Sequence, residues 1–227
     1  MNSYKTCVSR VRAQDRRMTV TVGGITQSQA ATRVLSSVAQ AHPEIDIVLV
    51  DGRNYPPEIA LLESHVDAYI SPMPSRMVKI DTHLSFIPIA EEQLVALVSA
   101  EGPLAKHDAV KLSSLSECTF IHVSEAFLSE PGWAQIEEQC EAKGFIPRSR
   151  IYFHSTEPLR LADNEVLILP QSEAERTQRQ YGHEEFKIVE ISDADARMTT
   201  YCITEADPPS KRVRLFKEYI EDAISIA

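Results

Sequence analysis

A short polar loop at residues 24–28 carries the residue types of an anion-binding site. Gly23 and Gly24 close a run of β-branched residues, and Thr26 and Ser28 place hydroxyl groups just before an amphipathic helical pattern. Free backbone N–H groups at the start of a helix, together with the helix dipole, favour a bound carboxylate. Ser28 alone is explained more simply as a helix cap. For the loop as a set we favour ligand binding, because ligands of open α/β sheets bind at the carboxyl ends of strands.

The pair His154 and Ser155 invites a different interpretation, as a base beside a nucleophile. Adjacent strand residues point to opposite faces, no G-x-S-x-G motif surrounds the serine, and no acid is spaced to orient the histidine. We therefore expect polar ligand contacts here and no enzymatic activity. Gly23-Gly24 lacks the rest of a phosphate-loop fingerprint, which argues against nucleotide binding.

The spacing of histidine and cysteine predicts neither a metal site nor a disulfide, and no cofactor is expected. The remaining histidines are scattered, and the four cysteines, at positions 7, 118, 140 and 202, form no C-x-x-C pair. Free thiols suit a reducing compartment. No apolar run reaches the length of about 18 residues that a membrane helix needs, and residues 1–17 do not resemble a secretory signal. We therefore expect a cytoplasmic protein that does not contact membranes.

The charge is distributed unevenly along the chain. The net charge is −10, yet residues 1–17 contain five basic residues against Asp15 alone and carry +4. Duplex binding depends on basic side chains that neutralise phosphates, so an acidic chain of this kind should repel DNA over most of its surface. The basic segment by itself is most simply a solvated helix face or tail.

Hydrophobic periodicity predicts the elements that would position the polar loops. In the first part of the chain, strands and helices alternate as in the βαβ units of a doubly wound sheet. The expected elements are a strand at 18–22, a helix at 28–41, a strand at 45–50, a short helix ending at 62 and a strand at 66–70.

The rest of the chain repeats this theme with other lengths. We expect strands at 84–89, 93–99, 117–123, 150–154, 166–169 and 198–204, a helix at 131–143 and a final helix around 213–223. The middle helix has a core stripe of Trp133, Ile136 and Cys140, and Gly144 is placed to cap it. This order permits two lobes with a cleft between them, where ligands would bind. Periodicity alone also fits a single doubly wound domain.

Several weak motifs, taken in order, resemble the effector-binding domain of LysR-type transcriptional regulators over residues 18–227. The resemblance begins with MTVTVGG at 18–24, the helix and strand from Val34 to Leu49, and VDAYI at 66–70. It continues through the segments that start at Phe86, Val110 and Phe120, and through the strand LILP at 167–170.

This resemblance implies a type 2 periplasmic-binding-protein-like fold, with two Rossmann-like α/β lobes joined by two hinge strands. Residues 18–92 and 198–227 would form lobe I, residues 93–197 lobe II, and residues 1–17 the end of a basic linker. It also implies an effector cleft between the lobes. The positions that line it would be Gly24, Ile25, Thr26, Gln27, Ser28, Ser71, Pro72, Met73, Val123, Ser124, Glu125, His154, Ser155 and Thr156.

The family further implies a sensor that binds a small-molecule effector and assembles as a homodimer or homotetramer. The first lobe of one subunit packs against the second lobe of another, which places helix 28–41 near that interface. The family contacts DNA through a winged helix-turn-helix, which 17 residues cannot encode, so we expect this chain to bind no DNA by itself.

Two other functions remain open. A solute-binding protein would share the two lobes, but a transport role calls for a signal peptide. An enzyme on this fold would need convergent acid and base groups, whereas the predicted cleft offers mostly hydroxyls and amides. Segment 154–165 also lacks the glycines that the family has there, so the wall of the second lobe departs from the family pattern.

Overall fold

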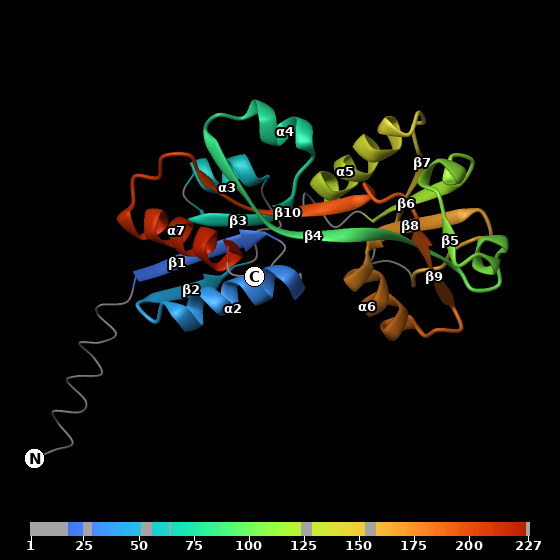
Figure 1. Cartoon of the computed structure of the whole chain (residues 1–227), viewed down its shortest axis with the longest axis horizontal. Helices are drawn as coiled ribbons and strands as arrows, with labels where there is room; N and C mark the ends of the chain where they lie inside the picture. The colour runs from blue at the N-terminus through green and yellow to red at the C-terminus, as the bar shows by residue number, and fades with distance from the viewer. Residues whose placement is uncertain are drawn as a thin grey trace, which may run out of the picture.

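The computed structural model describes residues 18–24, 29–50, 56–63, 65–123, 129–152 and 158–225. These residues form two α/β lobes that lie along the long axis of the molecule (Figure 1). The chain passes from the first lobe to the second within strand β4 (Leu84–Ser99) and returns in strand β10 (Arg197–Glu205). The predicted two-lobed α/β fold is therefore confirmed, and the alternative of a single doubly wound domain is wrong.

The first lobe is built on five strands in the order β2-β1-β3-β10-β4. Strand β1 pairs in parallel with β2 and β3, while β10 runs antiparallel to β3 and β4. Its other elements are β1 (Met18–Gly24), α2 (Gln29–Ala41), β2 (Ile45–Leu49), α3 (Pro57–Leu62), β3 (Ala68–Pro72), α4 (Ser75–Ile80) and α7 (Lys211–Ser225).

Both faces of this sheet are covered by apolar packing. On one face, Leu35 of α2 and Phe216 of α7 pack with strand residues such as Ile70. On the other face, Leu61 of α3 packs with Tyr69. Ile70 and Tyr69 are adjacent on β3 and both almost fully buried, which is the pattern of a central strand covered on both sides.

The second lobe continues from β4 through strands in the order β4-β8-β6-β7. Strand β9 pairs with the other edge of β4 and also with β5. The elements are β5 (Ala109–Val110), β6 (Thr119–Val123), α5 (Ser129–Ala142), β7 (Arg148–Tyr152), β8 (Glu165–Pro170), α6 (Gln171–Tyr181) and β9 (Phe186–Ile191), with short 3₁₀ turns at Pro103–Lys106 and Leu112–Leu115.

Strand β4 is a single strand of 16 residues, where the sequence predicted two. Its first part pairs with β10 as far as Gln93, and Leu94–Val98 pair with β8. The gap expected at residues 90–92 is absent, and the strand also contains Pro88, which has no N–H to donate to a ladder. The register with β10 shifts between Thr200 and Tyr201, opposite Pro88, so a local irregularity accommodates the proline without ending the strand.

Helix α5 follows its predicted pattern. Trp133, Ile136 and Cys140 belong to the apolar core of the second lobe, as expected. Gly144 has φ +89°, and the N–H of Phe145 donates to the carbonyl of Cys140, so a positive-φ glycine ends this helix as predicted. Helices α4 and α6 and strands β5 and β9 were not predicted from the sequence.

Candidate ligand-binding site at the junction of the lobes

The carboxyl ends of β1 and β3 lie side by side at the edge of the first lobe. Gly24 ends β1, pairs with Ile70 and has φ +91°. A Cβ atom at Gly24 would lie 2.1 Å from the Ile70 carbonyl oxygen. Only glycine fits at this point, so the close approach of the two strands fixes where the predicted loop at 25–28 begins.

The second predicted segment, Ser71 to Met73, is buried. Ser71 pairs with Tyr201 of β10, and its hydroxyl donates to the Pro72 carbonyl oxygen at 3.0 Å. The Met73 side chain belongs to the cluster beneath α3. Pro72 faces the second lobe, because a Cβ placed on Gly132 of α5 would lie 3.4 Å from its Cγ.

Val123, the one described position of the predicted set in the second lobe, ends strand β6. It pairs with Tyr152 of β7 and packs half-buried against that lobe's second apolar cluster. The remaining positions lie outside the described residues: Ile25, Thr26, Gln27, Ser28, Ser124, Glu125, His154, Ser155 and Thr156. Each of their three segments follows the carboxyl end of a strand, β1, β6 or β7.

Helix α5 of the second lobe joins directly to the first lobe through Gln135, a contact that the sequence analysis missed. This side chain is 5% exposed. Its Nε2 donates to the carbonyl oxygens of Met73 and Thr199, each at 2.7 Å, and its Oε1 accepts from the Thr199 N–H at 3.1 Å. A buried amide that is fully hydrogen-bonded in this way favours one arrangement of the groups around it.

Glu138, one turn further along α5, binds the start of α4. Its carboxylate accepts from the Ser75 N–H at 2.8 Å, from the Ser75 hydroxyl at 2.6 Å and from the Arg76 N–H at 3.2 Å. Partial burial opposes ionisation of Glu138, but the hydrogen bonds from Ser75 and Arg76 outweigh it and hold its pKa below the usual value. Gln135 and Glu138 are three residues apart, so they share one face of the helix.

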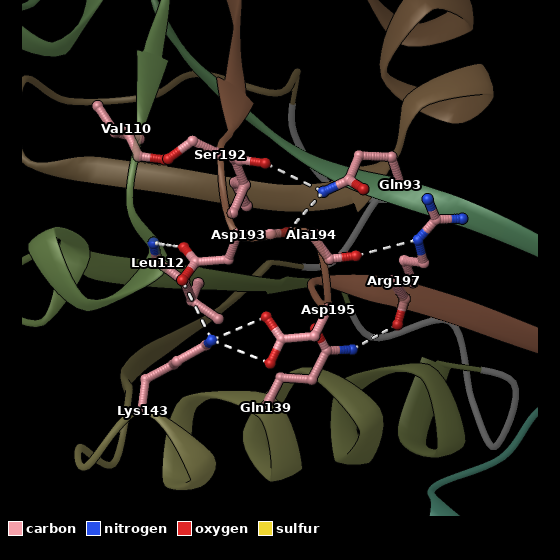
Figure 2. Close-up of polar contacts among 11 residues, drawn as sticks. Gln93, Val110, Leu112, Gln139, Lys143, Ser192, Asp193, Ala194, Asp195 and Arg197 are labelled. Carbon is pink, nitrogen blue, oxygen red and sulfur yellow. Dashed lines mark hydrogen bonds and ion pairs between the residues drawn. The ribbon is translucent and has the colours of Figure 1, made fainter.

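The far half of α5 is tied to the loop through which the chain leaves the second lobe (Figure 2). The ammonium of Lys143 contacts carboxylate oxygens of Asp193 at 3.1 Å and Asp195 at 2.8 Å. Asp193 also accepts from the Leu112 N–H at 2.7 Å. The hydrogen bond from Leu112 lowers the pKa of Asp193. Partial desolvation opposes this effect, and the positive charge and hydrogen bond of Lys143 add to it.

Strand β4 joins the same loop at the point where it crosses between the lobes. The amide of Gln93 donates to the carbonyl oxygens of Ile191 at 3.0 Å and Asp193 at 3.1 Å (Figure 2). Gln93 also pairs with Arg197, the first residue of β10, so the outgoing and returning strands meet here. At the hinge, the two strands that cross between the lobes are therefore paired with each other, and Gln93 ties them to the loop before β10.

The described residues add no other chemistry at the junction. They contain no group of three or more His, Cys, Asp or Glu side chains that could hold a metal ion. Within the same ranges, no helix combines the length and apolarity needed to cross a bilayer. The junction offers hydrogen-bonding backbone at strand ends, amide and carboxylate groups on α5, and the ion pairs of Lys143 with Asp193 and Asp195 at the hinge.

A family model described as the LysR substrate binding domain matches residues 12–225. No protein with a curated description matches the chain significantly in sequence.

Three solved structures illustrate the likeness in fold. The effector-binding domain of QuiR in complex with shikimate has a TM-score of 0.70 at 15% identity, covering 92% of this chain and 98% of that one. The BenM effector-binding domain with its effector benzoate has a TM-score of 0.65 at 18% identity, covering 92% of each chain. Full-length CbnR complexed with its target DNA has a TM-score of 0.68 at 15% identity, covering 95% of this chain and 74% of that one.

Proposed function

The chain belongs to the LysR substrate-binding domain family, and from this premise we propose that it binds a small anionic metabolite between its lobes and thereby controls transcription. The observation that carries the proposal is the family match, which spans nearly the whole two-lobed fold. We place lobe I at 18–92 and 198–227 and lobe II at 93–197. The change of pairing partner along β4, from β10 at Gln93 to β8 at Leu94, supports that division.

We propose that the effector contacts the loops at the carboxyl ends of β1, β3, β6 and β7. The pairing of Gly24 with Ile70 supports this, since it places the carboxyl end of β1 beside the last residues of β3. The second lobe would contribute residues 123–125 and 154–156. Ligands of open α/β sheets bind at such strand ends.

The anionic character of the effector is proposed from the start of α2. This helix begins at Gln29, directly after Ser28 and three residues after Thr26, and has no acidic residue in its first turn. A helix start of this kind favours a carboxylate. The ligands named for the QuiR and BenM structures, shikimate and benzoate, are both carboxylates.

The chain is proposed to act as a binding module and not as an enzyme. Its family is defined by ligand binding, and the described part of the junction holds amides, a carboxylate bound to backbone N–H groups and backbone carbonyls. Amides do not act as general acids or bases near neutral pH, and the carboxylate of Glu138 already accepts three hydrogen bonds.

We further propose that the chain assembles as a homodimer or homotetramer in the cytoplasm and that DNA binding belongs to a winged helix-turn-helix outside the given sequence. Strands β2 and β7 each end a sheet and expose apolar side chains, with Leu49 50% and Ile151 52% exposed. Unpaired edges with apolar residues favour association. Full-length CbnR, of which this chain matches 74%, was solved with its target DNA.

A thermal-shift screen of small carboxylates, with shikimate and benzoate among them, tests the proposal. A ligand at 100 times its dissociation constant should stabilise the fold by about 2.7 kcal/mol, or roughly 5–10 °C in Tm. Thr26→Val should abolish that shift. Ser37→Ala, which removes an exposed hydroxyl group from α2, should leave it intact. A shift that survives Thr26→Val would exclude the loop as the site, and turnover of the ligand would show an enzyme instead.

A further inference from the structure

Helix α5 moves as a part of the second lobe. Trp133, Ile136 and Cys140 anchor it in that lobe's core. The indole ring of Trp133 also stacks on the imidazole ring of His122 in β6, with ring centroids 4.7 Å apart and planes inclined by 8°. Any change in the position of the second lobe therefore carries α5 with it.

The opposite face of α5 is bonded to the first lobe at the segment Met73–Arg76 and, through Gln135, at Thr199 of β10. Gln135 donates to the Met73 carbonyl oxygen, and Glu138 accepts three hydrogen bonds from Ser75 and Arg76. We call these four hydrogen bonds the latch. The three bonds of Glu138 involve no residue of a crossing strand. Gln135, in contrast, also bonds Thr199 of β10, and Gln139 and Lys143 bond residues 193–197 at the hinge itself. A rotation about the hinge strands would thus break the Glu138 bonds of the latch before the bonds at the hinge.

The latch joins the two segments that we propose as ligand loops. Residues 73–76 continue directly from Ser71 and Pro72 at the end of β3, and α5 follows directly on the loop that contains Ser124 and Glu125. A ligand held by both loops would require the same approach of the lobes that the latch requires. Because a ligand shifts a two-state equilibrium by its differential affinity, ligand binding and latch formation should be coupled.

We propose that Gln135 and Glu138 are positioning residues that hold the two lobes in the arrangement that binds the effector, an inference that rests on the proposed ligand site. The latched arrangement is the binding-competent one. The apparent dissociation constant is the intrinsic one divided by the fraction of molecules in the competent arrangement. A variant that lowers this fraction to about one tenth would therefore bind about tenfold more weakly.

Glu138→Ala, compared with Glu141→Ala, provides the main test. Glu141 is exposed on the same helix, one turn beyond Glu138, so the two variants lose the same helix-forming carboxylate. Hydrogen exchange measured by NMR at the Ser75 and Arg76 amides, without ligand, should accelerate in Glu138→Ala and not in Glu141→Ala. Small-angle scattering should show wider lobe separation in the first variant alone.

Calorimetric titrations with shikimate and benzoate test the effect of the latch on ligand binding. A probe that binds the wild type should bind Glu138→Ala about tenfold more weakly, and by reciprocity it should slow exchange at Ser75 and Arg76 in the wild type. Gln135→Met should act in the same direction. In a double-mutant cycle, Ser75→Ala should have little effect on affinity once Glu138 is alanine.

The outcomes separate the two proposals. If neither these probes nor any other carboxylate binds the wild type, the proposed function fails, while exchange and scattering still decide whether the latch holds the lobes. If a probe binds wild type and Glu138→Ala within twofold of each other, the latch does not set affinity and the inference is overturned. Unchanged exchange at Ser75 in Glu138→Ala would overturn it as well.

Discussion

Replacement of Gly24 by alanine should destabilise the first lobe strongly. Two costs add at this position. An L-residue near φ +91° pays about 1–2 kcal/mol. The new Cβ would also lie 2.1 Å from the Ile70 carbonyl oxygen and 2.9 Å from its carbonyl carbon. Both are backbone atoms of a fully buried neighbouring strand, so the clash can be removed only if β1 and β3 separate. The total loss of unfolding free energy should therefore be about 3–5 kcal/mol.

Gly144→Ala is the matched control, because it separates the two costs. Gly144 has nearly the same backbone angle, φ +89°, but nothing lies within 4 Å of the position of its Cβ. It should therefore cost only the conformational strain, about 1–2 kcal/mol. The difference between the two variants measures the close approach of β1 and β3 alone.

Urea unfolding followed by far-UV circular dichroism measures both variants. The single tryptophan, Trp133, lies in the second lobe, so its fluorescence reports whether that lobe stays native. Gly24→Ala should also lose any carboxylate-induced thermal shift, because it displaces the loop at 25–28. Equal costs for Gly24→Ala and Gly144→Ala would refute the argument from strand contact.

Three further predictions concern the rest of the chain. Phe216→Ala, which empties a fully buried site between α7 and the sheet, should cost about 3–5 kcal/mol in urea unfolding, whereas Glu218→Ala on the exposed face should change stability by less than about 0.5 kcal/mol. Burial raises the pKa of the Cys202 thiol to about 12, so Cys202 should resist thiol reagents at pH 8 until the chain unfolds, and fast labelling of the native protein at that cysteine would contradict its burial. The hydrogen bond from Arg150, opposed by desolvation, lowers the pKa of Glu165 from 4.5, so its contribution to stability is present above about pH 4.5 and is lost as pH falls through the lowered value. Arg150→Gln should therefore differ most from wild type in urea unfolding near neutral pH and converge with it in acid, and a constant difference would contradict the pairing.

The sequence predicted the fold well where local patterns carry the information. The stripe of Trp133, Ile136 and Cys140 and the glycine at 144 identified α5 and its end, because periodicity and positive φ are local properties. Helix α6 was not predicted because Gln171–Tyr181 is almost entirely polar and buries only Ala174, so the sequence shows no apolar stripe there.

The polar contacts across the junction could not be predicted in this way. Gln135 and Met73 are 62 residues apart in sequence, and Glu138 and Ser75 are 63 apart. A glutamine or glutamate on a helix is ordinarily a solvated residue, and nothing in the residue type marks its partner. Only the fold, which places α5 across the end of β3, shows that these side chains are bonded to backbone groups of the other lobe.

In the segment Ser71–Met73, residue types alone do not show which groups face the junction. Tyr69 and Met73 belong to the same apolar cluster, and side chains alternate along a strand, so Ser71 points to that same side. Its hydroxyl is fully buried and already donates to Pro72. At the junction this segment presents the Pro72 ring and the Met73 carbonyl oxygen, which is bonded to Gln135. A ligand seated here would therefore meet backbone and a proline ring held in place by α5, so the side chains that discriminate between ligands must come from the neighbouring loops.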